Sequence, residues 1–118
     1  MRYMFLIYSD EQQWARMTPA EAEKAMGVWM AYTEEMAKAG VLRAGDPLKP
    51  TDTATTVRAK GGKVLHTDGP FAETKEQLGG YYIVEVPDLD AALRWAGKCP
   101  GVHGGAVEIR PIQELGGP

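Results

Sequence analysis

His66 and Asp68 are two residues of this chain whose types and spacing suit proton-transfer chemistry. They are two positions apart in an apparent strand, so their side chains point to the same face. A carboxylate placed in this way can orient an imidazole, and an oriented histidine can act as a general acid or base. Asp68 also suits a purely structural role, because an aspartate that enters a turn hydrogen-bonds the backbone two residues further on. The sequence leaves both roles open.

Further candidates follow in residues 67–82, TDGPFAETKEQLGGYY. Glu73 and Lys75 are charges of opposite sign close to Asp68, so we expect them to shape the charge of a substrate site if one exists here. Tyr81 is the aromatic candidate for contact with the same substrate. The segment holds more charged residues than a plain connection between two strands requires.

Charged residues also interrupt one face of the last two predicted strands, where Glu85, Glu108 and Arg110 alternate with apolar positions. Such a mixed face can form the wall of a mainly apolar cleft that contains a few polar groups, and Arg110 would then contact the substrate. The alternative is that these side chains are solvated or form ion pairs in a dimer, without any chemistry of their own.

Other common chemistries are not indicated. No histidine is spaced from Cys99 in a way that would activate its thiol, so we expect this thiol to be buried and inert. His103 is expected at the surface. The sequence has no metal-ligand spacing, no phosphate-binding loop and no nucleophile elbow, so it predicts neither a metal nor a cofactor.

Two helices are expected to support these residues. The first begins at Thr18 as N-cap, with proline at the first helical position and Glu21 completing a capping box, and it ends at Gly40. The second begins at Asp88. Their expected buried stripes are, for the first helix, Ala22, Met26, Trp29, Thr33, Met36 and Ala37, and for the second, Leu89, Ala92, Leu93 and Ala96. We interpret Met26, Met30 and Met36 as core filler rather than as the lining of a pocket.

Strands are expected at residues 3–8, 41–48, 79–86 and 106–112, the second of them interrupted by a turn at 45–47. Residues 53–60 and 63–69 are predicted to form a β-hairpin, because the glycine pair 61–62 permits a tight reversal. The order predicts an α+β, ferredoxin-like fold, with a mainly antiparallel sheet, two helices on one face and an extra β-hairpin. Both faces of residues 3–8 are apolar, so we expect a second subunit to cover the face without helices.

Composition limits the alternatives. With 118 residues, 44% of them hydrophobic and 25% charged, the chain suits one soluble domain, residues 1–118. The net charge of −3 and the scattered lysines and arginines argue against direct nucleic-acid binding. A single cysteine and the lack of a long apolar run predict a cytoplasmic protein with no membrane segment.

The motif DGPF at 68–71, continued by ETKE at 73–76 and by GGYY at 79–82, resembles the DGPF-domain branch of the YCII-related family. The likeness extends to AGVLRAGDPLKPTDTATTVR upstream and to DAALRWAGKCP and VEIRPI downstream. It implies a ferredoxin-like, dimeric α/β-barrel fold. The wider family resembles enzymes, with a recurring histidine and aspartate, and some relatives act in the breakdown of haloaromatic compounds. Asp68 matches the aspartate of the motif, whereas the first predicted helix contains no histidine.

Two functional hypotheses remain open. In the first, a homodimer binds an unknown small molecule in a cleft on the sheet face and performs proton transfer or hydrolytic chemistry, with Asp68 as acid or base. In the second, the protein is a regulatory binding module. The resemblance implies an extracytoplasmic-function sigma factor as partner in that case, because DGPF-domain proteins are associated with such factors.

Overall fold

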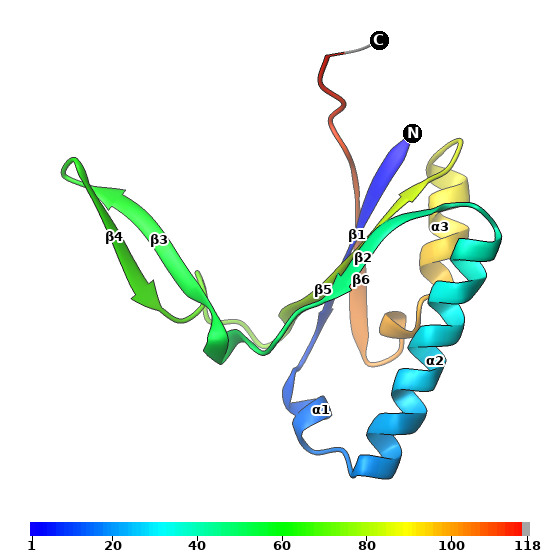
Figure 1. Ribbon diagram of the computed structural model, residues 1–118, viewed down its shortest axis with the longest axis horizontal. Coiled ribbons are helices and arrows are strands. Elements are labelled where there is room, and N and C mark those ends of the chain that lie inside the picture. Colours follow the sequence, from blue (N-terminus) through cyan, green and yellow to red (C-terminus); the bar gives the residue numbers. More distant parts are fainter. Residues whose placement is uncertain (117–118) are drawn as a thin grey trace.

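The structure, a computed structural model, describes residues 1–116 and contains two separate antiparallel sheets (Figure 1). The main sheet has the strand order β2-β5-β1-β6. Its strands are β1 (Arg2–Ser9), β2 (Leu42–Pro47), β5 (Gln77–Glu85) and β6 (Gly105–Pro111). The second sheet consists of β3 (Thr55–Lys60) and β4 (Lys63–Asp68), and the α-helices are α1 (Gln12–Ala15), α2 (Pro19–Lys38) and α3 (Leu89–Gly97). The predicted α+β, ferredoxin-like arrangement is confirmed.

Both ends of α2 follow the sequence signals. The Thr18 hydroxyl accepts a hydrogen bond from the Glu21 backbone N–H, and the Glu21 carboxylate accepts one from the Thr18 N–H. At the other end Gly40 has a φ of 76°, and the Val41 N–H donates to the Met36 carbonyl at 3.1 Å. This pair of features is a Schellman motif, which needs a residue that tolerates positive φ.

The start of α3 was predicted correctly, but its buried stripe was partly wrong. Asp88 Oδ1 accepts from the Ala91 N–H at 2.9 Å and caps the helix. Leu89 and Leu93, which were expected to be buried, are 49% and 53% exposed. Alanines and a cysteine face the sheet instead: Ala91, Ala92, Ala96 and Cys99. These small side chains let the helix approach the sheet closely, which leaves the larger leucines on its flank.

The buried stripe of α2 also differs from the prediction. Tyr32 and Met36 are the buried residues of this helix, and Tyr32 was not expected there. Met26 is 47% exposed and Met30 is 64% exposed, so the interpretation of the methionines as core filler holds for Met36 alone. Ala37 is exposed as well. Met26, Met30 and Ala37 border a cavity rather than the core.

The expected turn at residues 45–47 is absent, because β2 continues through Pro47. The irregularity in its pairing with β5 lies earlier, between Leu42 and Ala44. Gly45 is needed for close packing rather than for a reversal of the chain. A Cβ atom at this position would lie 2.5 Å from the Tyr82 ring, which is closer than any stable contact.

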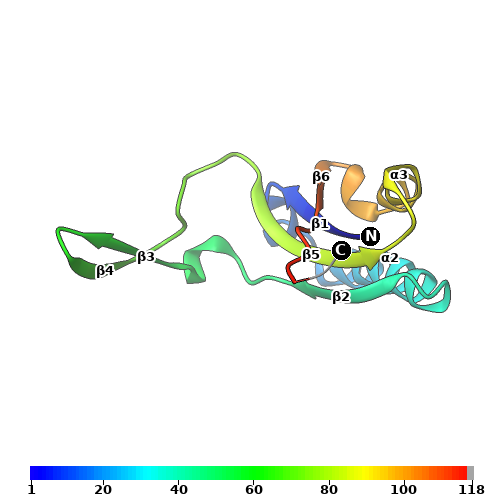
Figure 2. The same cartoon turned by 90° about the horizontal axis from the view of Figure 1, so that it is seen from above.

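The two faces of the main sheet differ in what covers them. Tyr3, Phe5 and Ile7 are buried against α2 and α3. Met4 and Leu6 point to the opposite side and are half-buried. No helix of residues 1–116 covers this second side, which we call the open face (Figure 2).

The hairpin of β3 and β4 stands away from the main sheet (Figures 1 and 2). Gly61 and Gly62 have φ values of 58° and 81°, so the predicted glycine-pair turn is confirmed. We call residues 55–68 the arm, the end at residues 61–62 its tip and the end at Thr55 and Asp68 its root. Every residue of the arm except Thr56 is exposed.

Hydrogen bonds hold the segments that lead into the arm. The Glu11 carboxylate accepts from the Thr51 backbone N–H at 3.0 Å and from the Thr51 hydroxyl at 2.6 Å. The Glu11 N–H donates to the Gln77 side-chain oxygen at 2.9 Å, and the Leu48 N–H donates to the Gly79 carbonyl. Because chain segments on both sides of the arm are tied to the same glutamate, the main body sets the direction in which the arm projects.

Candidate functional site

A cavity of about 740 Å³ lies between α2 and the edge of the main sheet formed by β2 and β5. Residues 48–50, which lead from β2 toward the arm, form part of its wall, as do Glu11 and Trp14 near α1. This volume falls within the range of about 300 to 1,000 Å³ that small-molecule sites occupy. The cavity is therefore large enough for a ligand of several rings or for a smaller one with water.

The wall of the cavity is largely aromatic and apolar. Trp14, Met26, Trp29, Met30 and Leu48 contribute to it. The rings of Trp29 and Tyr82 are stacked, with centroids 6.4 Å apart and an interplanar angle of 22°. Parallel aromatic planes beside polarizable methionines favour a flat, apolar ligand.

One hydrogen-bonded pair provides a polar point on this wall. The Thr33 hydroxyl donates its single proton to the Trp29 carbonyl at 2.9 Å, so the Tyr82 hydroxyl is the donor in the 2.6 Å contact between Thr33 and Tyr82. Burial raises the pKa of Tyr82, so the phenol stays protonated at neutral pH. Its oxygen keeps free lone pairs and can accept a hydrogen bond from a ligand.

A further polar pair lies across β2 and β5 on the open face, where Tyr81 is the register partner of both Leu6 and Asp46. The Tyr81 hydroxyl donates to Asp46 Oδ2 at 2.7 Å, and this hydrogen bond raises the pKa of Tyr81. Asp46, Glu11 and Glu34 all border the cavity, together with Lys49. Because acidic groups outnumber basic ones in this lining, a neutral or hydrogen-donating ligand suits the site better than an anion.

The candidates predicted from sequence lie in different parts of the molecule. Tyr81 borders the cavity. His66 and Asp68 lie on β4 in the arm, and Glu73 and Lys75 lie in the loop that leads from the arm to β5, all of them exposed. Their proposed catalytic and substrate-binding roles stay predictions.

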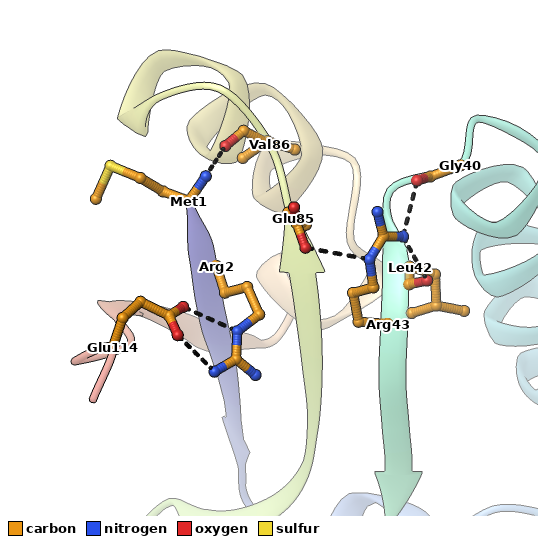
Figure 3. Close-up of polar contacts among 8 residues, drawn as sticks. All are labelled: Met1, Arg2, Gly40, Leu42, Arg43, Glu85, Val86 and Glu114. Carbon is orange, nitrogen blue, oxygen red and sulfur yellow. Dashed lines mark hydrogen bonds and ion pairs between the residues drawn. The ribbon is translucent and has the colours of Figure 1, made fainter. Parts of the chain in front are cut away.

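The charged residues on the open face form ion pairs within the chain. Arg110 lies 3.7 Å from Glu108, and Arg43 lies 3.3 Å from Glu85. Near the same end of the sheet Arg2 makes two hydrogen bonds of 2.9 Å to Glu114 (Figure 3). All of these side chains are substantially exposed, and such pairs contribute little to stability. A role for Arg110 in substrate binding likewise stays a prediction.

Sequence reasoning missed the main residues of the cavity. Trp29, Thr33 and Tyr82 had been considered only as parts of a helix and a strand, and Trp14 had not been considered. One signal was present, since Thr33 is a hydroxyl within an otherwise apolar helical stripe, and a half-buried hydroxyl needs a partner. Among residues 1–116 no group of three or more histidine, cysteine, aspartate or glutamate side chains is arranged to hold a metal ion.

The fold and the cavity define a class of small α+β protein, in which two helices cover one face of a four-stranded antiparallel sheet. The chain belongs to the YCII-related family, whose domain model matches residues 1–116. It is 37% identical over 114 residues to the uncharacterized protein R00369 of Rhizobium meliloti (strain 1021), covering 95% of this chain and 92% of that protein.

Among solved structures, the chain is similar to 5-chloro-2-hydroxyhydroquinone dehydrochlorinase (TftG) from Burkholderia phenoliruptrix AC1100, in complex with 2,5-dihydroxybenzoquinone. The TM-score is 0.55 with 14% sequence identity, over 96% of this chain and 94% of that one. At this identity the likeness establishes the shared fold. In the part of the chain that the structure describes, no helix is both long and apolar enough to cross a membrane.

Proposed function

We propose that this protein binds a small, flat and mostly apolar molecule in the cavity between α2 and the β2–β5 edge. The observation that carries the proposal is the cavity itself, with Trp14, Trp29, Met26 and Met30 in its wall and the Tyr82 hydroxyl as a polar point. Such a combination of apolar walls and few polar groups is the usual composition of a small-molecule site.

The polar groups narrow the ligand class. A hydroxyl or other donor on the ligand can reach the acidic side chain of Glu34 or the Tyr82 oxygen, while an aromatic ring lies against Trp29. Hydroxylated ring compounds meet both requirements. Neutral hydroquinone is a compound of this kind and supplies the first probe, and the 2,5-dihydroxybenzoquinone named with the structural neighbour, whose hydroxyls are vinylogous acids ionised at neutral pH, serves as an anionic ring for comparison.

Titration calorimetry with a panel of hydroxylated rings, including hydroquinone and 2,5-dihydroxybenzoquinone, tests this proposal. Ala37→Phe places a ring in the cavity, whereas Ala31→Phe introduces the same change at an exposed position of α2 outside the cavity. We expect Ala37→Phe to weaken binding by about tenfold or more, equivalent to about 1.4 kcal/mol, and Ala31→Phe to leave it unchanged. Equal affinity of both variants, or no binding of any ring compound to the wild type, would refute the proposal.

The second part of the proposal is a homodimer, with the open face covered by a second copy. Met4, Leu6, Tyr81 and Ile83 lie in register at the centre of that face, where they are only half-buried in one chain. Light scattering coupled to gel filtration tests it. Leu6→Lys is expected to give a monomer, whereas Leu93→Lys, on the exposed flank of α3, is expected to leave the dimer intact. A monomeric wild type, or a dimer that survives Leu6→Lys, contradicts this part.

Catalysis is the second candidate function, and the same-face placement of His66 and Asp68 on β4 supports it. In this version Asp68 acts as acid or base toward the bound molecule, with Glu73, Lys75 and Arg110 contributing charge. Asp68→Asn would then keep ligand affinity and lose turnover. If Asp68→Asn changed neither ligand affinity nor turnover, Asp68 would have no part in the mechanism.

A regulatory role in the cytoplasm, with one domain over residues 1–118 and an extracytoplasmic-function sigma factor as partner, rests on the resemblance to DGPF-domain proteins. Purification of a tagged chain from its native host under mild conditions tests it. Recovery of such a sigma factor would support the role, and recovery of the homodimer alone would count against it.

A further inference from the structure

The arm exposes far more apolar surface than an isolated hairpin normally does. Val57, Val64 and Leu65 are 62%, 74% and 48% exposed. Two strands without further packing are marginally stable in water, and three or more are needed for an independently stable sheet. Yet the arm is not a loosely attached loop, since Glu11 holds the segments on both sides of it. A fixed hairpin with exposed apolar residues suits contact with another molecule.

Both strands of the arm also have an unpaired backbone edge. In a two-stranded sheet each strand is an edge strand, so its outward N–H and C=O groups are available to another chain. Natural proteins usually protect such edges with charged residues. β4 has none between its two ends, because Val64, Leu65, His66 and Thr67 separate Lys63 from Asp68.

The charges of β4 favour pairing with its own copy. When a strand pairs with an identical strand about a two-fold axis, the central residues meet and the two ends are exchanged. The four central residues of β4 include no aspartate, glutamate, lysine or arginine, and its ends, Lys63 and Asp68, have opposite charges. These two side chains are five positions apart and point to opposite faces of the strand, so each charged end lies beside the oppositely charged end of the second copy without a direct side-chain pair. β3 is less suitable, because Arg58 lies near its centre and would approach the same arginine of the second copy.

Around the whole arm, as along β4, the tip is basic and the root is acidic. Lys60 and Lys63 are paired at the tip. Near the root, acidic residues outnumber basic ones: Asp52, Asp68, Glu73 and Glu76 are acidic, and Lys49 and Lys75 are basic. An antiparallel arrangement of two arms therefore places a basic tip beside an acidic root at both ends.

We propose that two copies of this chain join their arms through antiparallel pairing of β4 with β4, which converts two hairpins into one four-stranded sheet. The partner that the arm recognises is thus a second copy of the same chain. Residues 48–50 and Gln77 border the cavity and lead toward the root, so the partner's tip approaches this end of the cavity. The pairing does not require the ligand, but it rests on the dimer proposed through the open face, and light scattering before oxidation separates a lost dimer from a lost arm contact.

Disulfide cross-linking tests the pairing directly. Cys99 is fully buried and cannot form a disulfide between copies, so any cross-link comes from the introduced cysteines. Leu65→Cys and His66→Cys lie at the centre of β4, and Val57→Cys is a matched control at an exposed position on β3. We expect at least one of the two β4 variants to form covalent dimers several times faster than the control under mild oxidation. Equal rates for all three variants would overturn the proposal.

Charge exchange supplies the second test, made in the background of the better cross-linking cysteine. Lys63→Asp and Asp68→Lys each remove the attraction between the two ends, and we expect each to slow cross-linking. The double variant restores opposite charges in every pair of copies, and so should cross-link as fast as the parent. A mixture of the two single variants should also regain the rate.

These outcomes separate self-pairing from other partners of the arm. If the arm instead bound nucleic acid through its basic tip, the double variant would not be rescued, and the proposal would fail. All the substitutions lie on exposed positions outside the core, and circular dichroism before oxidation verifies that the main body is folded.

Discussion

Two methionines on the same helix are predicted to respond differently to the same substitution. Met36 is fully buried in the core, whereas Met30 is 64% exposed beside the cavity. Met36→Ala removes the buried atoms beyond Cβ and leaves a void, which costs about 2 to 5 kcal/mol. This is a large share of a total stability of about 5 to 15 kcal/mol. Met30→Ala removes the same atoms from a mostly solvated position, so we expect a change within about 0.5 kcal/mol.

Urea denaturation measures the difference. A loss of about 3 kcal/mol with a slope near 2 kcal/mol/M shifts the midpoint of unfolding by about 1.5 M. The slope itself should be unchanged, because the surface exposed on unfolding is the same. Met30→Ala should instead weaken ring-compound binding at the cavity. Equal losses of stability in the two variants would show that the assignment of one methionine to the core and the other to the cavity is wrong.

Three further predictions concern local contacts. Asp88→Ala removes the N-cap of α3 and should cost about 1 kcal/mol in urea denaturation, while Asp88→Asn should retain most of it. Burial raises the pKa of the Cys99 thiol, so it should resist a thiol reagent at mildly alkaline pH until the chain is unfolded; fast labelling of the native protein would contradict this. The hydrogen bond from the Thr18 N–H lowers the pKa of Glu21 below its ordinary value of 4.5, so the stabilisation is complete above that pH and is lost as the pH falls through the lowered value. In an NMR titration Thr18→Pro, which removes this N–H at a φ of −68° that proline can adopt, should move the pKa back toward 4.5, and an unchanged pKa in this variant would refute the capping contact.

Local signals explain the parts of the fold that the sequence predicted. The capping box of Thr18 and Glu21, the cap at Asp88 and the glycine pair of the hairpin each depend on residues within a few positions of one another. These features do not require knowledge of what packs against the element. Their positions were therefore predicted correctly from the chain alone.

The cavity depends on tertiary placement and could not be predicted in this way. Met26 and Met36 are of the same type and both belonged to the predicted stripe of α2, yet one borders a cavity and the other is in the core. What separates them is how α2 lies against the β2–β5 edge, and this is set by contacts distant in sequence. For the same reason the hairpin was predicted, but not its projection away from the main sheet.

The ladder between β2 and β5 continues up to the pair Pro47 and Gly80, and one further hydrogen bond joins Leu48 to Gly79. The arm is thus an insertion at the end of two strands that are already paired without it. Lengthening or shortening such an insertion changes the closure entropy only slowly, by about 0.6 kcal/mol for each doubling of length. This corner of the sheet is therefore a place where related chains can gain, lose or exchange a segment while the core stays intact. Because residues 48–50 also form a wall of the cavity, each exchange would alter the cavity and the proposed pairing of the arms together.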